Sequence, residues 1–262
     1  MSLTIQQVID TILAGMTKPP EAETVDGFKS GDPAQPVTGV VTTFIATPEV
    51  IRKAATAGAN LIITHEPTYY THIDQTDWLA ENEQYHAKKK LIEDLGMTIW
   101  RFHDGWHRTQ PDGILTGMVA QLGWQDYQEP DDPWIFNIPA STLLETARHF
   151  KTRLNASTLR YVGPADLPCK RAAFLPGAIW EKWQINALSK ADVLAVGEAN
   201  EWSVVEFARD SQQLGRTKGL ILIGHVASEE GGMEYLGEWL RERIPNLPIT
   251  HISAGAPPIK KL

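Results

Sequence analysis

Short apolar segments rich in β-branched residues recur along the chain, and several of them stop at residues that bind metals. Three segments are followed directly by a histidine: residues 61–64 precede His65, residues 97–102 precede His103, and residues 219–224 precede His225. A short, continuous apolar run is typical of a strand that is covered on both faces. After the first run, Pro67 lacks an N–H and ends the hydrogen-bond ladder. The pattern predicts three buried strands whose ends carry imidazoles and carboxylates.

Between these strands, apolar residues recur every three or four positions, which is the period of an amphipathic helix. One helix start is clear, because Thr47, Pro48 and Glu49 supply a cap, a first-turn proline and a first-turn acid. Expected helices span about residues 4–15, 47–57, 78–95, 115–122, 141–154, 180–188, 202–213 and 228–243. Expected strands span residues 37–44, 61–64, 97–102, 159–162, 171–175, 193–196, 219–223 and 248–252. This alternation predicts an α/β fold with parallel strands in right-handed βαβ units.

A segment rich in proline and acidic residues, 129–133, separates two sets of elements. We therefore expect two α/β lobes, residues 1–128 and residues 129–262, each large enough to bury a core of its own. Ligands of open α/β sheets bind at the carboxyl ends of the strands. We expect the functional site at those ends, with His65, Glu66, His103 and His107 from the first lobe and Glu198, His225 and Glu229 from the second.

Composition narrows the classes of function. The 24 basic and 32 acidic residues give a formal net charge of -8, which repels nucleic acid and anionic membranes. The single cysteine, Cys169, excludes an internal disulfide and a CxxC site, and we expect it to be a buried structural thiol. No apolar run approaches the roughly 18 residues of a membrane span. We expect a cytoplasmic protein with neither a membrane nor a nucleic-acid partner.

The candidate metal ligands follow from type and spacing. His225 and Glu229 lie four residues apart at the start of an expected helix, so their side chains share one face. His103 and His107 have the same spacing, with Gly105 leaving either a helix or a loop possible. Zinc, iron, manganese and cobalt accept mixed imidazole and carboxylate ligands. The full set is His65, Glu66, His103, His107, His225 and Glu229. It suffices for two ions roughly 3.5–4 Å apart, with Glu229 as the bridging ligand.

Each of these residues has a simpler interpretation. A single histidine after a strand is more often a surface or capping residue than a ligand. However, four of the eight histidines lie at the three strand ends with a carboxylate nearby, which favours a shared role as metal ligands. Glu198 orients a ligand or caps the next helix, and Asp104 orients an imidazole or forms a turn. The aromatic residues that suit stacking on a substrate ring are Tyr69, Tyr70, Trp106 and Trp202.

The sequence lacks the motifs of several other kinds of catalytic or binding site. The sequence has no GxGxxG after a strand, no GxxxxGK[ST] and no GxSxG. These absences argue against a dinucleotide site, a phosphate-binding P-loop and an α/β-hydrolase nucleophile elbow.

The motifs together resemble those of the NIF-three-like dinuclear metal-centre hexameric family, whose members are often called GTP cyclohydrolase I type 2 homologues. The resemblance covers most of the chain. It rests on residues 47–50 and 58–67, on Leu-Arg-Tyr-Val-Gly at 159–163, on Gly197-Glu198, and most specifically on Gly-His-Val-Ala-Ser-Glu at 224–229. It implies two intertwined, three-layer α/β lobes with a two-metal site between them and a toroidal homohexamer. His65, His225 and Glu229 match the family's ligands directly.

The chain departs from the family pattern at two ligand positions. Glu66 stands where relatives usually have a second histidine before the proline, and His107 stands where they have a bridging aspartate. The two exchanges keep the number of ligands and roughly the charge, which indicates a rearranged site. Because imidazole bridges two metals poorly, one full site with a weaker second metal is an alternative.

Two functions remain. The first is a metal-dependent hydrolase acting on a nucleotide or other small ring or phosphate substrate, with a metal-activated water and with Glu66 or Glu198 as general base. The second is a metal-binding hexameric scaffold or regulatory partner without a reaction of its own. We favour the hydrolase.

Overall fold

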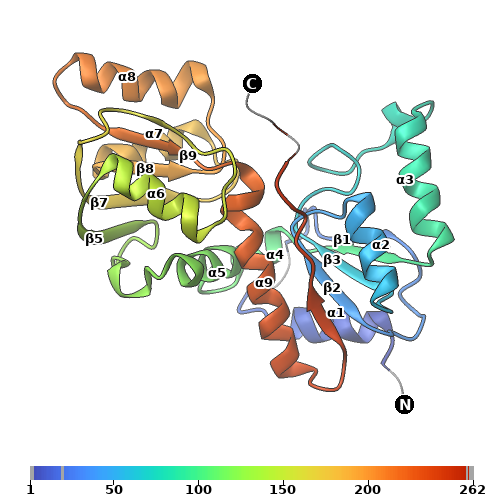
Figure 1. Cartoon of the computed structure of the whole chain (residues 1–262). Helices are drawn as coiled ribbons and strands as arrows, with labels where there is room; N and C mark the ends of the chain where they lie inside the picture. The colour runs from blue at the N-terminus through green and yellow to red at the C-terminus, as the bar shows by residue number, and fades with distance from the viewer. Residues whose placement is uncertain (1–2, 19–20, 258, 260–262) are drawn as a thin grey trace. The chain divides into compact units, whose positions relative to one another are not determined.

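The computed structural model describes residues 3–18, 21–257 and 259 (Figure 1). The chain forms two compact units, residues 1–117 with 232–254 and residues 118–231 with 255–262. Each unit contains one five-stranded mixed sheet with helices, which confirms the predicted α/β class. The long helix α9 (His225–Arg243) begins in the second unit and ends in the first. The chain thus returns to its first unit after building the second.

The sheet of the first unit has the order β1-β4-β3-β2-β10. Its strands are β1 (Gly27–Ser30), β2 (Val40–Thr43), β3 (Leu61–Thr64), β4 (Thr98–Arg101) and β10 (Ile249–His251). Strands β10, β2, β3 and β4 are parallel neighbours, and β1 pairs antiparallel with β4 at the edge. Residues 61–64 form a strand as predicted, and every one of them is buried. The carboxyl ends of four parallel strands therefore meet at one edge of this sheet.

Helices cover both faces of the first sheet. Helix α2 (Pro48–Thr56) and α3 (Glu83–Asp94) pack on the face that carries Val41, Ile62 and Ile99. On the other face, Gly237 in the second half of α9 lies close to Thr42 of β2. Helix α1 (Ile5–Ala14) packs beside it and starts with a capping box at its first turn. The helix expected over residues 78–95 is wrong at its start: η1 (Asp77–Leu79) comes first, and Asn82 caps α3.

The second unit repeats this architecture with the strand order β5-β7-β8-β9-β6. Its strands are β5 (Ile135–Thr142), β6 (Arg160–Val162), β7 (Pro168–Leu175), β8 (Val193–Val196) and β9 (Gly219–Leu222). Strands β7, β8 and β9 are parallel, whereas β5 and β6 pair antiparallel at the two edges. Three parallel strands therefore deliver their carboxyl ends to one edge of the second sheet.

One face of the second sheet packs against α7 (Glu181–Lys190), the π-helix η3 (Glu201–Val205) and α8 (Glu206–Gln213). The other face packs against α6 (Leu143–Arg153), where the rings of Phe150 and Phe174 lie 5.4 Å apart. Two further elements, α5 (Gly113–Leu122) and η2 (Gln125–Tyr127), precede β5. Among the described residues, every helix is too short or too polar to cross a membrane.

Candidate metal centre

The first unit brings three histidines together at the carboxyl edge of its sheet. His65 follows β3 and His103 follows β4, and these strands are parallel neighbours with Thr64 opposite Arg101. His107 lies on α4 (Asp104–Arg108), the short helix that follows His103. The ring centroid of His65 is 4.4 Å from that of His103 and 4.9 Å from that of His107, and the last two are 5.1 Å apart. One ligand atom of each residue lies within 4.8 Å of the others, close enough to share an ion.

Each of these imidazoles is oriented by a contact at its Nδ1 atom. Nδ1 of His103 lies 2.9 Å from Asp104 Oδ1, and Nδ1 of His107 lies 3.0 Å from Asp112 Oδ2. Nδ1 of His65 lies 3.4 Å from the Phe102 carbonyl oxygen. Since all three partners are acceptors, the proton belongs on Nδ1, which makes Nε2 the metal-binding nitrogen of each imidazole. Three neutral imidazoles are a known donor set for zinc.

The acceptor of His103 is itself held in place. Asp104 Oδ2 accepts hydrogen bonds from the Thr24 hydroxyl at 2.8 Å and the Val25 amide at 3.0 Å. The hydrogen bond with His103, together with these donors, lowers the pKa of Asp104 well below its usual range. Asp104 therefore stays ionised and orients the imidazole, the first of the two roles expected for it.

The start of α4 is anchored by a distant carboxylate. Asp26 accepts hydrogen bonds from the backbone amides of His103, Asp104 and Gly105, at 2.6, 2.9 and 2.7 Å. Burial raises the pKa of Asp26, and these backbone hydrogen bonds oppose the rise. Gly105 allows this approach, because a Cβ there would lie 2.8 Å from Oδ2 of Asp26 and 2.4 Å from the Phe102 ring. The open choice between a loop and a helix is settled as one short helix.

Glu66 lies beside this cluster. Its Oε1 atom is 3.7 Å from Nε2 of His103, and its Oε2 atom is 3.8 Å from the buried guanidinium of Arg101. The side chain of Glu66 is mostly buried, and that of His103 is partly open to solvent. The donor set of the first unit is thus three imidazoles with one adjacent carboxylate, which fits a divalent cation of intermediate hardness.

The second unit carries its own imidazole and carboxylate set. His225 and Glu229 lie on the first turns of α9, with Nε2 of His225 3.0 Å from Oε2 of Glu229. The helix begins at His225, so its predicted start at residue 228 is wrong. Nδ1 of His225 lies 2.9 Å from Oε1 of Glu198, which follows β8, and this hydrogen bond lowers the pKa of Glu198. Glu198 contacts an imidazole rather than capping the next helix, whose cap position is Asn200.

The carboxylate of Glu229 lies against the backbone that follows β7. Gly177 has a φ of +72°, and a Cβ built on it would lie 2.2 Å from Oε1 of Glu229. The Gly177 amide donates a 2.9 Å hydrogen bond to the Ser228 hydroxyl, which donates at 2.7 Å to the carbonyl of His225. Three neighbouring strand ends therefore hold this pair, and only glycine fits at position 177.

Within each unit, the structure brings the predicted residues together. His65, Glu66, His103 and His107 lie together in the first unit, and Glu198, His225 and Glu229 lie together in the second. The expectation that the two lobes share one site stays a prediction.

Some residues that support the site were missed, and two stacking candidates were wrong. Asp26 and Asp112 occur in polar loops without any pattern that marks them, and Gly177 has no sequence motif around it. Trp106 and Tyr69 are buried and cannot stack on a substrate, whereas Tyr70 and Trp202 are exposed.

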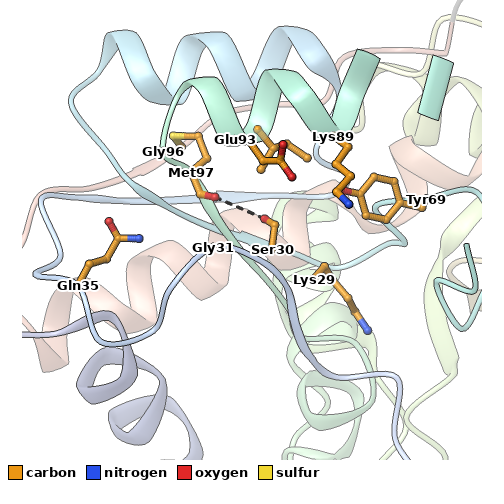
Figure 2. A pocket seen from close by; sticks show the side chains of 10 residues that line it. Lys29, Ser30, Gly31, Gln35, Tyr69, Lys89, Glu93, Gly96 and Met97 are labelled. Atoms are coloured by element: carbon orange, nitrogen blue, oxygen red, sulfur yellow. Dashed lines mark hydrogen bonds between the residues drawn. The ribbon is translucent and has the colours of Figure 1, made fainter. Parts of the chain in front are cut away.

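A pocket of about 340 Å³ lies elsewhere in the first unit, between β1 and the end of α3 (Figure 2). None of the candidate metal ligands lines it, although Tyr69 does. Several of its polar side chains are already engaged: Ser30 bonds the Met97 carbonyl, Gln35 bonds Thr98, and Lys29 bonds the Val25 carbonyl. The candidate metal ligands therefore lie at the strand ends and not in this pocket.

The sequence also matches a family model, Duf34/NIF3 (NGG1p interacting factor 3), over residues 4–258. The chain belongs to the Duf34/NIF3 family. Two relatives, each called a GTP cyclohydrolase 1 type 2 homolog, are similar along most of their length. The one from Clostridium perfringens is 24% identical over 230 residues, covering 83% of each chain. The one from Chlamydia pneumoniae is 25% identical over 249 residues, covering 88% of this chain and 90% of the relative.

Solved structures agree on the fold of this Duf34/NIF3 chain. A Bacillus cereus protein related to NIF3 superposes with a TM-score of 0.81 at 16% identity and covers 100% of both chains. The Staphylococcus aureus hypothetical protein SA1388 gives a TM-score of 0.76 at 19% identity, again covering 100% of both. The family model confirms the family resemblance, and these solved structures confirm the fold.

Proposed function

We propose that this chain is a metal-dependent hydrolase. The observation that supports the proposal most directly is the shared arrangement of His65, His103 and His107. Each has an acceptor at Nδ1, and one ligand nitrogen of each lies within 4.8 Å of the others. Ligand histidines are typically oriented in this way by carboxylates and carbonyls.

His65, His103 and His107 would hold a divalent ion, which would supply the Lewis-acid chemistry for activating water near neutral pH. The donors contain no thiolate, so zinc, iron, manganese and cobalt all remain compatible. We propose two ions per chain, with His65, His103 and His107 as ligands of one and His225 and Glu229 as ligands of the other.

Two carboxylates have proposed roles in the reaction. Glu66 is the candidate general base, because its Oε1 atom lies 3.7 Å from Nε2 of His103 and therefore beside the imidazoles. Glu198 holds Nδ1 of His225 and so fixes the direction of that imidazole. With its side chain 59% exposed, Glu198 can also accept a proton from solvent or substrate.

The proposed substrate is a nucleotide or another small molecule with a ring and a phosphate. The names of the two curated relatives point to a guanine nucleotide, and the low identity makes this a statement about class only. We also propose a homohexamer, as the family resemblance implies. Sedimentation velocity would test this state, because a hexamer has six times the chain mass.

The test of the function is a substrate screen with matched variants. Purified protein stripped of metal and reloaded with zinc, iron, manganese or cobalt is incubated with nucleotides and phosphodiesters, and products are followed by chromatography. We expect sustained, metal-dependent product formation that is lost in Glu66→Gln and Glu229→Ala. His86→Ala is the control, since His86 bonds the Ala80 carbonyl on a different part of the first unit. Metal binding without any turnover would favour the scaffold.

A further inference from the structure

Arg101 is the last residue of β4, and its side chain is completely buried. Its Nε atom donates a 2.9 Å hydrogen bond to the carbonyl oxygen of His65. Its Nη1 atom donates to the carbonyl oxygen of His72. Its Nη2 atom lies 3.8 Å from Oε2 of Glu66. One guanidinium therefore contacts both ends of the segment 65–72, which carries the first metal-ligand candidate and its neighbouring carboxylate.

Asp74 contacts both the same segment and the guanidinium of Arg101. Its Oδ1 atom accepts a 2.7 Å hydrogen bond from the amide of Tyr69. Its Oδ2 atom lies 3.7 Å from Nη1 of Arg101 and 3.7 Å from Nζ of Lys29. The side chain of Asp74 is only 4% exposed. The carboxylate thus ties the middle of the loop to the guanidinium that holds its ends.

The loop does not have a relaxed backbone. Tyr70 and Asp74 have φ values of 68° and 54°, in the left-handed region that side chains disfavour. Lys88 is a second buried cation beside this loop, and its Nζ atom donates a 2.7 Å hydrogen bond to the carbonyl of Thr68. Surrounding groups must impose such a conformation, which is common where a loop presents functional residues.

Stability alone is a weak reason for these charges. Among the described residues, neither Nη2 of Arg101 nor Oδ2 of Asp74 has a hydrogen-bond partner, although both are buried. Their contacts at 3.7 and 3.8 Å are ionic, without a hydrogen bond at those two atoms. Removing charges from water is costly, and buried ion pairs are often no more stabilising than apolar residues of equal size. A role in positioning the loop accounts for these buried charges better than a contribution to stability does.

We propose that Arg101 and Asp74 are positioning residues of the metal centre. They fix the segment that begins with His65 and Glu66, so that the imidazole stacks on His103 and the carboxylate lies 3.7 Å from the His103 ring. The proposal rests on the proposed metal-binding function and adds the residues that preorganise it. Displacing a ligand's supporting contacts typically weakens metal binding about 10- to 100-fold.

The test is a cobalt titration of metal-free protein, followed by the visible absorption of bound Co²⁺, which reports the ligand geometry. Arg101→Lys keeps the charge but loses the planar fork that reaches both carbonyls. Asp74→Asn keeps the acceptor for Tyr69 and removes the charge. Asp94→Asn is the matched control, because Asp94 forms an exposed ion pair with Lys90 at 2.7 Å on α3 of the same unit.

We expect Arg101→Lys and Asp74→Asn to bind cobalt at least about 10-fold more weakly, with a changed absorption spectrum, while Asp94→Asn matches the wild type. Circular dichroism establishes that each variant is folded, and Asp74→Asn alone decides the matter if Arg101→Lys does not fold. An unchanged spectrum and affinity in the folded variants overturns the positioning role. Failure of the wild type to bind cobalt would instead refute the proposed function.

Discussion

The imidazole rings of His65 and His103 stack with their centroids 4.4 Å apart, although the residues come from different strands. The parallel pairing of β3 and β4 produces this contact, because it brings the residues that follow the two strands to the same edge of the sheet, although the strands are 37 positions apart in sequence. Two such rings beside a third, that of His107, form a candidate metal site that the unfolded chain does not have. Metal binding should therefore be linked to folding.

The first prediction concerns that linkage. Zinc or cobalt at about 100 times its dissociation constant should raise the free energy of unfolding by about 2.7 kcal/mol, since it binds the native state preferentially. His103→Ala should lose most of this gain, whereas His86→Ala should retain it. Thermal unfolding with and without added metal measures the effect. Equal stabilisation of the two variants would show that the ion binds elsewhere.

The second prediction concerns Asp112, which contacts Nδ1 of His107 at 3.0 Å and accepts a 2.9 Å hydrogen bond from the Leu115 amide. Asp112→Asn should keep the cap at Leu115, because asparagine is a good N-cap. It should weaken metal binding about 10- to 100-fold through the imidazole it no longer orients.

Isothermal titration with zinc would measure this change, with Asp10→Asn on α1 as the control. A loss of stability with unchanged affinity would mean that Asp112 serves only as a helix cap.

Much of this fold can be predicted from the sequence, because the residue pattern within a short segment often specifies its secondary structure. Residues 61–64 and 193–196 form strands as expected, because a continuous apolar run specifies a covered strand without further information. Strands β1 and β5 were not predicted. β1 is short and contains Lys29, and β5 contains Pro139, so that each depends on an antiparallel partner at a sheet edge.

The candidate ligands could be predicted for the same reason, since they directly follow the apolar runs. Their supporting residues could not. Asp26 lies 77 positions before His103, and no periodicity links an acid in a polar loop with a distant helix start. Arg101 looks like an outward-facing residue at the end of a strand, yet it is fully buried by contacts that only the tertiary structure creates.

The third prediction separates backbone strain from ligand placement at Gly177. Gly177→Ala and Gly215→Ala both put a side chain on a residue with φ near +70°, which costs roughly 1–2 kcal/mol. Only the first places a Cβ against Glu229, because nothing lies within 4 Å of the equivalent atom at Gly215. We expect Gly215→Ala to lose about this amount in urea unfolding and Gly177→Ala to lose more, because its Cβ must also displace Glu229.

Only Gly177→Ala should lose metal from the His225 and Glu229 set, as measured by the stoichiometry of bound metal. Matching stoichiometry in the two glycine variants would mean that the position of Glu229 is not important for binding.

The fourth prediction follows from Lys88, whose burial lowers its pKa from 10.5 to about 8. Below pH 8 the lysine is charged in both states, and burial destabilises the fold by about 3 kcal/mol. Between pH 8 and 10.5 the unfolded chain binds the additional proton, so the wild type gains stability as pH rises. Replacement by an uncharged residue removes this dependence.

Lys88→Met should therefore be more stable than the wild type at pH 7 by about 2 kcal/mol, after loss of the hydrogen bond to Thr68. The difference should shrink between pH 8 and 10.5 in urea unfolding. Lys90→Met, on the exposed side of α3, should show no such trend. A constant difference across this range would mean that burial does not lower the pKa of Lys88.

The most direct test of the account is the metal content of the protein, measured by elemental mass spectrometry after purification without chelator or metal-affinity tag. We predict close to two divalent ions per chain, with fewer in a His103→Ala and His107→Ala double variant. One ion or none, unchanged after titration with zinc, iron, manganese and cobalt, would contradict it.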